Sequence, residues 1–220
     1  MRNSKSYSVK QMVMLALLAA IAYMMVSLVR IPVVLFLKYE PKDVIITIGG
    51  FLFGPMASFT VSLLVSLLEM VTISETGPIG ALMNLLSTCT FACTAAIIYK
   101  KKHTLSGAIL ALIGGTILMT IAMILWNWLI TPIYMGYPRD VVAGMLVPVF
   151  LPFNLLKAGL NSAFVLFLYK PLVTALRKTG LVASKEQSGG SNNKKMGASL
   201  LGLLLLGTCI LLLLVFQGKI

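Results

Sequence analysis

Residues 105–130 read LSGAILALIGGTILMTIAMILWNWLI, and this stretch contains no charged side chain. A helix needs about 20 mostly apolar residues to cross the hydrocarbon core of a bilayer. In the whole chain of 220 residues, 59% are hydrophobic and 11% are charged. In soluble domains, roughly 45–50% of the residues are apolar and about 25% are charged. So much apolar surface cannot be hidden in one small core, so the sequence predicts an all-α, polytopic integral membrane protein.

Other apolar segments precede and follow this stretch, separated by short polar loops and by turn signals such as Gly54-Pro55. A short apolar hook at 33–37 interrupts the pattern after the first segment. The segments predicted to be helical are 9–31, 44–53, 56–71, 79–99, 105–130 and 152–176. Residues 1–178 are therefore predicted to form one six-helix membrane domain.

The composition changes after this domain. Residues 179–195 are rich in Ser, Gly, Asn and Lys, which is typical of a flexible linker. Residues 196–218 are leucine-rich and long enough to span. We expect them to form a seventh, C-terminal transmembrane helix.

The net charge of +12 has a simple explanation in this topology. With the N-terminus inside, twelve Lys and Arg residues fall in inner loops and five in outer loops, and Lys157 lies within a helix. Cytoplasmic loops carry such an excess. We expect a multi-pass membrane protein with a cytoplasmic N-terminus, and four acids, Glu40, Asp43, Glu75 and Asp140, outside. Nucleic-acid binding would need a basic face with groups that read or stack on bases.

The sequence gives no positive support to an enzyme. It contains no GxxxxGK[ST] phosphate loop, no HExxH and no GxSxG. Six acids, a single histidine and three cysteines without ligand spacing offer neither a paired-carboxylate site nor a metal site. We therefore expect no catalytic residue, no metal and no cofactor.

Polar residues inside a membrane helix are costly and mark functional sites by default. Asn154, Lys157 and Asn161 stand at i, i+3 and i+7, so they share one helix face. Asn127 sits between Trp126 and Trp128 in the preceding apolar segment. The sequence predicts that these groups line a cavity open to the outside.

These polar residues could also have purely structural roles. An Asn can bond across helices, and Lys157 can snorkel to the surface or pair with Glu69. As a ligand site, amides present a donor and an acceptor side by side, which suits the imide edge of a planar heterocycle. Lysine suits a carbonyl, and Tyr39 and Trp126 could stack on a flat ring. A vitamin-sized heterocycle fits this set best.

A second feature is Ala16-x-x-x-Ala20 in the first apolar segment. Small residues four apart let another helix approach closely. The spacing alone favours equally a partner protein and packing within the chain.

Three motifs carry a resemblance to a known family. The runs LKYEPKDV at 37–44, GGFLFGP at 49–55 and PFNLLK at 152–157 resemble the substrate-binding S components of energy-coupling factor (ECF) transporters. Among these, the chain is most similar to the riboflavin-specific branch, over about residues 9 to 178. The extra apolar stretch after the linker departs from the family pattern.

The resemblance implies a six-helix fold in a bacterial cell membrane that binds riboflavin from outside as a transported ligand. It implies three partner subunits, one transmembrane coupling protein and two ATPases, which would account for the missing phosphate loop. It makes Ala16 and Ala20 the docking motif for the coupling protein. It also makes Asn127, Asn154 and Lys157 flavin contacts, with the first loop at Leu37, Lys38 and Tyr39 covering the site.

Three alternatives remain at this stage. The same fold could bind another vitamin, or the chain could be a membrane-embedded enzyme acting on lipid or isoprenoid. A structural protein without a ligand would not need Lys157 and Asn154.

Overall fold

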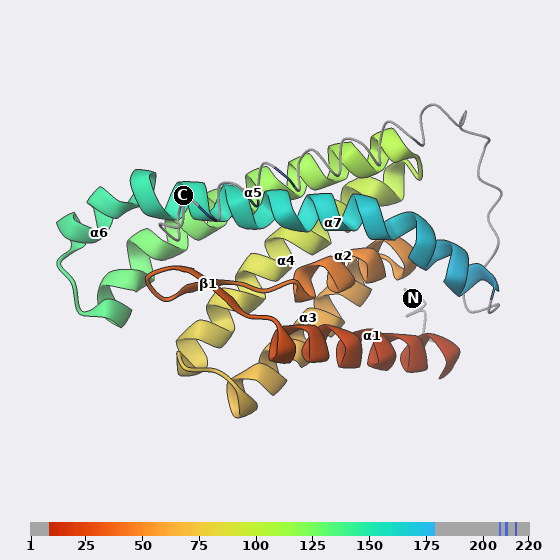
Figure 1. Ribbon diagram of the computed structural model, residues 1–220, viewed down its shortest axis with the longest axis horizontal. Helices are drawn as coiled ribbons and strands as arrows, with labels where there is room; N and C mark the ends of the chain where they lie inside the picture. The colour runs from red at the N-terminus through yellow and green to blue at the C-terminus, as the bar shows by residue number, and fades with distance from the viewer. Residues whose placement is uncertain (1–8, 179–206, 208–209, 211–213, 215–220) are drawn as a thin grey trace, which may run out of the picture.

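The computed structural model describes residues 9–178 and the single positions 207, 210 and 214, and Figure 1 shows their arrangement. The predicted linker at 179–195 lies outside the described residues, and so does nearly all of the predicted helix at 196–218. The described elements are α1 Val9–Leu28, β1 Ile31–Val34, β2 Leu37–Tyr39, α2 Lys42–Phe53, α3 Pro55–Thr72, α4 Gly77–Lys101, α5 Leu105–Met135, α6 Arg139–Met145, the π-helix η1 Leu146–Phe150, and α7 Leu151–Lys178.

Each of the six segments predicted to be helical within residues 9–178 contains a helix, although some of the boundaries differ. Within the described residues, five stretches are long and apolar enough to cross a membrane: α1, α3, α4, α5 and the run Arg139–Tyr169. At 1.5 Å per residue, the 12 residues of α2 span only about 18 Å. The chain is a multi-pass membrane protein, and α2 is too short by itself to count as a sixth full crossing.

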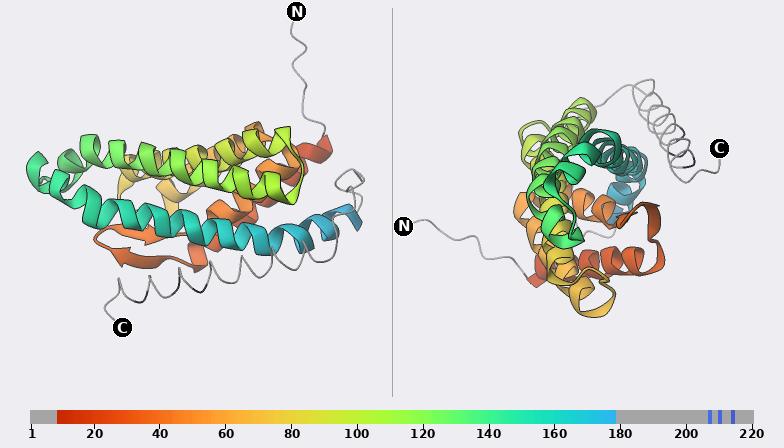
Figure 2. Two further views of the ribbon diagram at one scale, coloured as in Figure 1. Left: turned by 90° about the horizontal axis from the view of Figure 1, so that it is seen from above. Right: turned by 90° about the vertical axis from the view of Figure 1, so that its left-hand side faces the viewer.

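The helices lie side by side along the long axis of the molecule (Figures 1 and 2). α4 is central, because it packs against α5, α3 and α2. α1 covers α2 and α3, while α7 packs on α5 and α2. Large apolar side chains such as Leu110, Ile117 and Ile121 are exposed on the outside, as expected where lipid solvates the surface.

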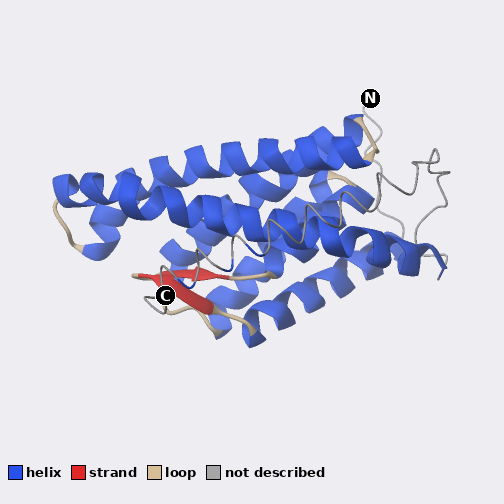
Figure 3. Ribbon diagram, turned by 45° about the horizontal axis from the view of Figure 1, so that its top comes forward, coloured by secondary structure: helices blue, strands red, loops and turns tan. Residues whose placement is uncertain are grey.

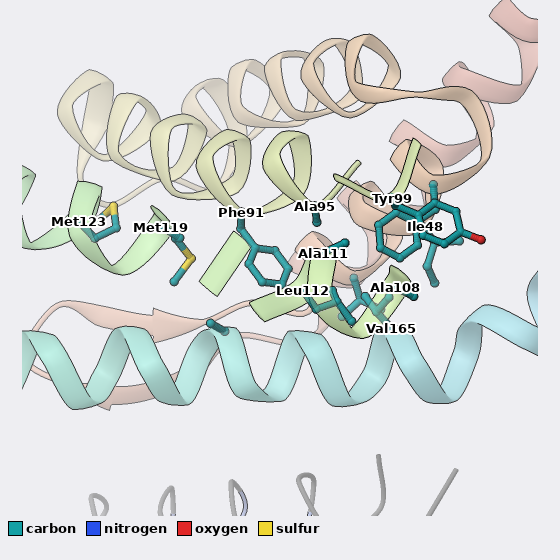
Figure 4. Close-up of a cluster of buried hydrophobic side chains, with 13 residues drawn as sticks. Ile48, Phe91, Ala95, Tyr99, Ala108, Ala111, Leu112, Met119, Met123 and Val165 are labelled. Carbon is teal, nitrogen blue, oxygen red and sulfur yellow. The ribbon is translucent and has the colours of Figure 1, made fainter. Parts of the chain in front are cut away.

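One core cluster joins α2, α4, α5 and α7 (Figure 4). Phe91 of α4 and Leu112, Met119 and Met123 of α5 form much of it. Gly115 permits the close approach of these two helices, since a Cβ there would lie 2.7 Å from the carbonyl oxygen of Phe91. The resulting close pair, α4 and α5, forms the frame on which α2, α3 and α7 pack.

The prediction of an all-α fold is wrong in one respect. The apolar hook at 33–37 belongs to an antiparallel hairpin in which Ile31 pairs with Tyr39 and Pro32 with Lys38 (Figure 3). Pro32 cannot continue a helix, and the β-branched residues around it favour an extended chain. For this reason α1 ends at Leu28 rather than at residue 31.

Two boundaries also differ from prediction. The helix 105–130 is predicted to end before Pro132, but α5 continues through it to Met135 and is followed by Gly136, which adopts the left-handed conformation. Membrane helices tolerate an internal proline where neighbouring groups satisfy the freed carbonyl. The residues preceding 152 are helical too, because α6 and η1 lead directly into α7.

Candidate functional site

A cavity of about 310 Å³ lies at the hairpin end of the bundle. Its walls come from the hairpin, the α3–α4 loop, α4, α5 and α7. Its size is at the lower limit of pockets that hold small organic ligands. The lining residues are Arg30, Leu35, Phe36, Leu37, Lys38, Glu40, Ser74, Glu75, Thr76, Met83, Asn84, Ser87, Met123, Tyr134, Phe153, Asn154 and Lys157.

Asn154 contributes an unsatisfied acceptor to this cavity. Its side-chain amide donates to the carbonyl oxygen of Phe150 at 2.7 Å. That carbonyl can only accept, so the Nδ2 atom must face it. The Oδ1 atom has no hydrogen-bond partner, although the side chain is only 1% exposed. Buried polar atoms are nearly always paired. Oδ1 of Asn161 and Oγ1 of Thr120 are also buried without a partner among the residues that the structure describes, but of these three residues only Asn154 lines the cavity, so its oxygen is the one placed to accept from a ligand.

The π-helix η1 helps to position Asn154. Phe150, the last residue of η1, supplies the carbonyl that holds the amide. Pro148 and Pro152 flank Phe150 and lack backbone N–H groups. π-helical turns occur often at functional sites, and here the turn orients the side chain that follows it.

Lys157 contributes a donor one helical turn further along α7. Its Nζ atom lies 3.3 Å from Oδ2 of Asp43 and donates to Oγ of Ser87 at 3.2 Å. An ammonium group carries three N–H donors, and these contacts use two of them. The cavity wall therefore offers an acceptor at Asn154 and a donor at Lys157, a pair suited to a ligand with adjacent N–H and C=O groups.

Some of the other predicted site residues line the cavity or its neighbour, and others do not. Leu37 and Lys38 line the cavity, and Trp126 lines a small adjoining hollow of about 10 Å³. Tyr39 is buried in the apolar cluster below the hairpin. Asn127 is buried within α5, where it donates to Met123 and accepts from Thr131. Tyr39 and Asn127 line neither space, and a role for them in binding stays a prediction.

The suggested pairing of Lys157 with Glu69 is wrong. Lys157 pairs with Asp43, and Glu69 pairs with Lys42 at 2.5 Å. Asp43 was expected outside in a loop, yet it is fully buried in the first turn of α2. The order Pro41-Lys42-Asp43 is a recognisable helix start, a proline followed by an acid in the first turn. That signal would have placed Asp43 on the helix.

A second group of charges adjoins the same cavity, and of its members only Glu69 is singled out from the sequence. Glu40 contacts Lys42 at 2.7 Å and Arg30 at 3.3 Å. Asn84 donates to Glu69 at 3.2 Å. With Asp43 and Lys157, the cluster holds three cations and three acids, so its formal charges cancel. This balance explains why so many charges are tolerated inside the bundle.

The mouth of the cavity carries an exposed ion pair. Lys38 of β2 and Glu75 of the α3–α4 loop lie 2.6 Å apart. The hydrogen bond and the positive charge of Lys38 hold the pKa of Glu75 below its ordinary value. This pair ties the hairpin to the opposite rim of the cavity.

Ala16 and Ala20 lie on the outer face of α1. Both are exposed, whereas Ala19 and Ala22 are buried against the bundle. The small residues four apart are thus not used for packing within the described part of the chain.

Most of the chain matches a known protein family. The family described as "ECF transporter, substrate-specific component" matches residues 10–169. The chain therefore belongs to the substrate-specific components of ECF transporters. This is a family of transport components rather than of enzymes.

Individual relatives agree with that assignment. The chain is 30% identical over 178 residues to the riboflavin transporter RibU of Staphylococcus aureus (strain TCH60), covering 77% of this chain and 93% of that protein. It is 28% identical over 166 residues to the riboflavin transporter FmnP of Bacillus subtilis (strain 168), covering 68% and 84%. A solved structure, described as the S component of a bacterial ECF transporter, matches with a TM-score of 0.65 at 30% identity, covering 76% of this chain and 98% of that one.

The ion pair at the mouth gives a pH-dependent prediction. Because the pKa of Glu75 is lowered in the folded protein, the stabilisation from the Lys38–Glu75 ion pair is fully present above the ordinary pKa of a glutamate, about 4.3. This stabilisation is lost as the pH falls through the lower pKa that Glu75 has in the folded protein. At pH 7, the substitution Glu75→Gln should speed hydrogen exchange of the hairpin amides by about 1.5- to fivefold, a small effect because exposed ion pairs contribute little. At pH values below the folded pKa, the two proteins should exchange alike.

Hydrogen–deuterium exchange of residues 31–39, compared at each pH, measures this effect. Asp140→Asn is the control, because Asp140 is an exposed acid of α6 with no ion pair among the described residues. Equal exchange in the wild type and Glu75→Gln at pH 7 would show that the pair does not hold the hairpin.

Proposed function

We propose that this chain is the riboflavin-binding subunit of an ECF-type ABC transporter that mediates vitamin uptake. The observation that carries the proposal is the unpaired Oδ1 of buried Asn154 beside the Lys157 ammonium in the cavity wall. Relatives that are named riboflavin transporters support it.

The chemistry of the flavin matches these two groups. The pyrimidine edge of the isoalloxazine ring carries an imide N–H flanked by two carbonyl oxygens. The Asn154 oxygen would accept from the imide N–H, and the remaining Lys157 donor would reach a neighbouring carbonyl. The spacing of one helical turn on α7 places both groups on the same side of the ligand.

The remaining predicted contacts complete this picture. Leu37 and Lys38 of the hairpin would cover the bound ring, with Tyr39 supporting them from below. Trp126 would pack on the flat ring from the adjoining hollow. Asn127 would contribute through Met123, whose carbonyl it holds and which lines the cavity.

The proposed topology has the N-terminus in the cytoplasm and the cavity facing outside. The basic run Lys100–Lys102 ends α4 at the opposite end from the cavity, in agreement with the excess of cations in cytoplasmic loops. In this topology α2 is a short sixth crossing, and 196–218 forms a seventh helix after the linker. Riboflavin is the transported ligand, and no resident cofactor is part of the proposal.

The proposed partners are one transmembrane coupling protein and two ATPase subunits. The sequence contains no phosphate loop of its own, so in this proposal the ATPase subunits would supply ATP hydrolysis. The exposed Ala16 and Ala20 would let a helix of the coupling protein approach α1 closely.

The binding site is tested by two substitutions. Asn154→Ala and Lys157→Ala should each weaken riboflavin binding by roughly 1–3 kcal/mol, the cost of deleting one buried polar contact. Leu155→Ala is the matched control, because the neighbouring Leu155 is exposed on the outer face of α7. Quenching of flavin fluorescence by the purified protein in detergent measures all four affinities. A wild-type protein that fails to quench micromolar riboflavin would refute the function, and unchanged affinity in both variants would place the site elsewhere.

The docking surface is tested separately. Replacing Ala16 or Ala20 with Leu should reduce uptake by at least about tenfold, which corresponds to ~1.4 kcal/mol of lost docking energy, and should leave riboflavin binding intact. Ile121→Phe, a bulky change at an exposed position of α5, should affect neither. Uptake is measured in cells that also produce the coupling and ATPase subunits. Loss of binding in the Ala16 and Ala20 variants would instead indicate a role inside the bundle.

A further inference from the structure

Asp43 has an unusual environment for a carboxylate in a membrane protein. It lies in the first turn of α2 with no solvent exposure, and it is not among the residues that line the cavity. Three side chains from two other helices converge on it. Thr88 of α4 donates to Oδ1 at 2.6 Å, and Asn161 and Lys157 of α7 reach Oδ2 at 3.2 and 3.3 Å.

These contacts fix the carboxylate independently of Lys157. Thr88 and Asn161 each hold one oxygen. The position near the N-terminus of α2 also favours a negative charge, because the unpaired backbone N–H groups point toward it. Asp43 is therefore a rigid anchor between α2, α4 and α7.

Lys157 has little else to define its position. A lysine side chain has four rotatable bonds and loses considerable entropy when it is held in one conformation. Besides Asp43, its ammonium contacts only the hydroxyl of Ser87 within the described part of the chain. A buried ammonium without a counter-charge would also be strongly unfavourable. Asp43 supplies both the counter-charge and the direction.

We propose that Asp43 is a positioning residue for ligand binding. Its carboxylate holds the Lys157 ammonium from behind, so that the remaining N–H points into the cavity beside Oδ1 of Asn154. The pairing also cancels the lysine charge, so the wall presents a directed donor to a neutral heterocycle rather than a free cation. This inference rests on the proposed riboflavin function and assigns a role to a residue that does not touch the ligand.

A double-mutant cycle on the full-length protein tests the proposal, with riboflavin affinity measured by fluorescence quenching. Asp43→Asn should weaken binding roughly tenfold or more, within the range of coupling between residues in one network. In a Lys157→Met background, the same substitution should change the affinity by less than about twofold, the limit for independent sites. A purely structural role of Asp43 would give the same loss in both backgrounds.

Glu69→Gln is the matched control. Glu69 of α3 is also buried and does not line the cavity. It pairs with Lys42, the neighbour of Asp43 in the first turn of α2. Any effect of this substitution should be the same with and without Lys157→Met. If the effect of Glu69→Gln on riboflavin affinity depended on Lys157 as strongly as that of Asp43→Asn, the cycle would report a general loosening of α2. That result would overturn the proposal.

Thr88→Val provides a second route if Asp43→Asn does not fold. It removes the hydrogen bond to Oδ1 and keeps the charge of Asp43. A loss of affinity that disappears in the Lys157→Met background supports the positioning role. Equal effects in both backgrounds, or no effect, overturn it. A wild-type protein that does not bind riboflavin overturns the proposed function itself, a result distinct from an additive cycle in a protein that binds.

Discussion

Charges inside a membrane helix bundle must find partners among themselves, because lipid supplies no hydrogen bonds. In this protein the pairs converge on the first turn of α2. Lys42 holds Glu40 and Glu69, and Asp43 holds Lys157. α2 is too short to count as a full crossing, and its buried charges tie it to α3, α4 and α7. The cavity lies directly beside this cluster, so the packing of the helices and the geometry of the site depend on the same ion pairs.

Among the few buried polar atoms without a partner in the described residues, the one at the cavity wall carries the most information. Asn154 uses its amide donor within the chain and leaves its oxygen at the cavity wall. Lys157 is held from behind and has a donor remaining. An acceptor left unpaired at the wall of a cavity is expected where a ligand completes the hydrogen bond. The membership of the chain in a family of substrate-specific transport components agrees with that reasoning.

Much of this could be predicted from the sequence because bilayer physics acts on composition. Long apolar segments gave the helices, and the i, i+3 spacing placed Asn154 and Lys157 on one face. The partner of Lys157 could not be found in this way, because the pairing joins residues 114 positions apart and depends on helix packing. The hairpin was missed because its strands are short and apolar, like the helices around them. The passage of α5 through Pro132 depends on tertiary contacts that override local preference.

The most direct measurement compares riboflavin with its N3-methyl derivative in the wild-type protein. Methylation at N3 removes the imide N–H, which should donate to Oδ1 of Asn154, and leaves the rest of the ring unchanged. We expect binding to weaken by about tenfold or more, the cost of an unpaired buried acceptor, and this difference to disappear in Asn154→Ala. Equal affinity of the wild-type protein for both flavins would contradict the assignment of Asn154 and Lys157 as the groups that read the imide edge.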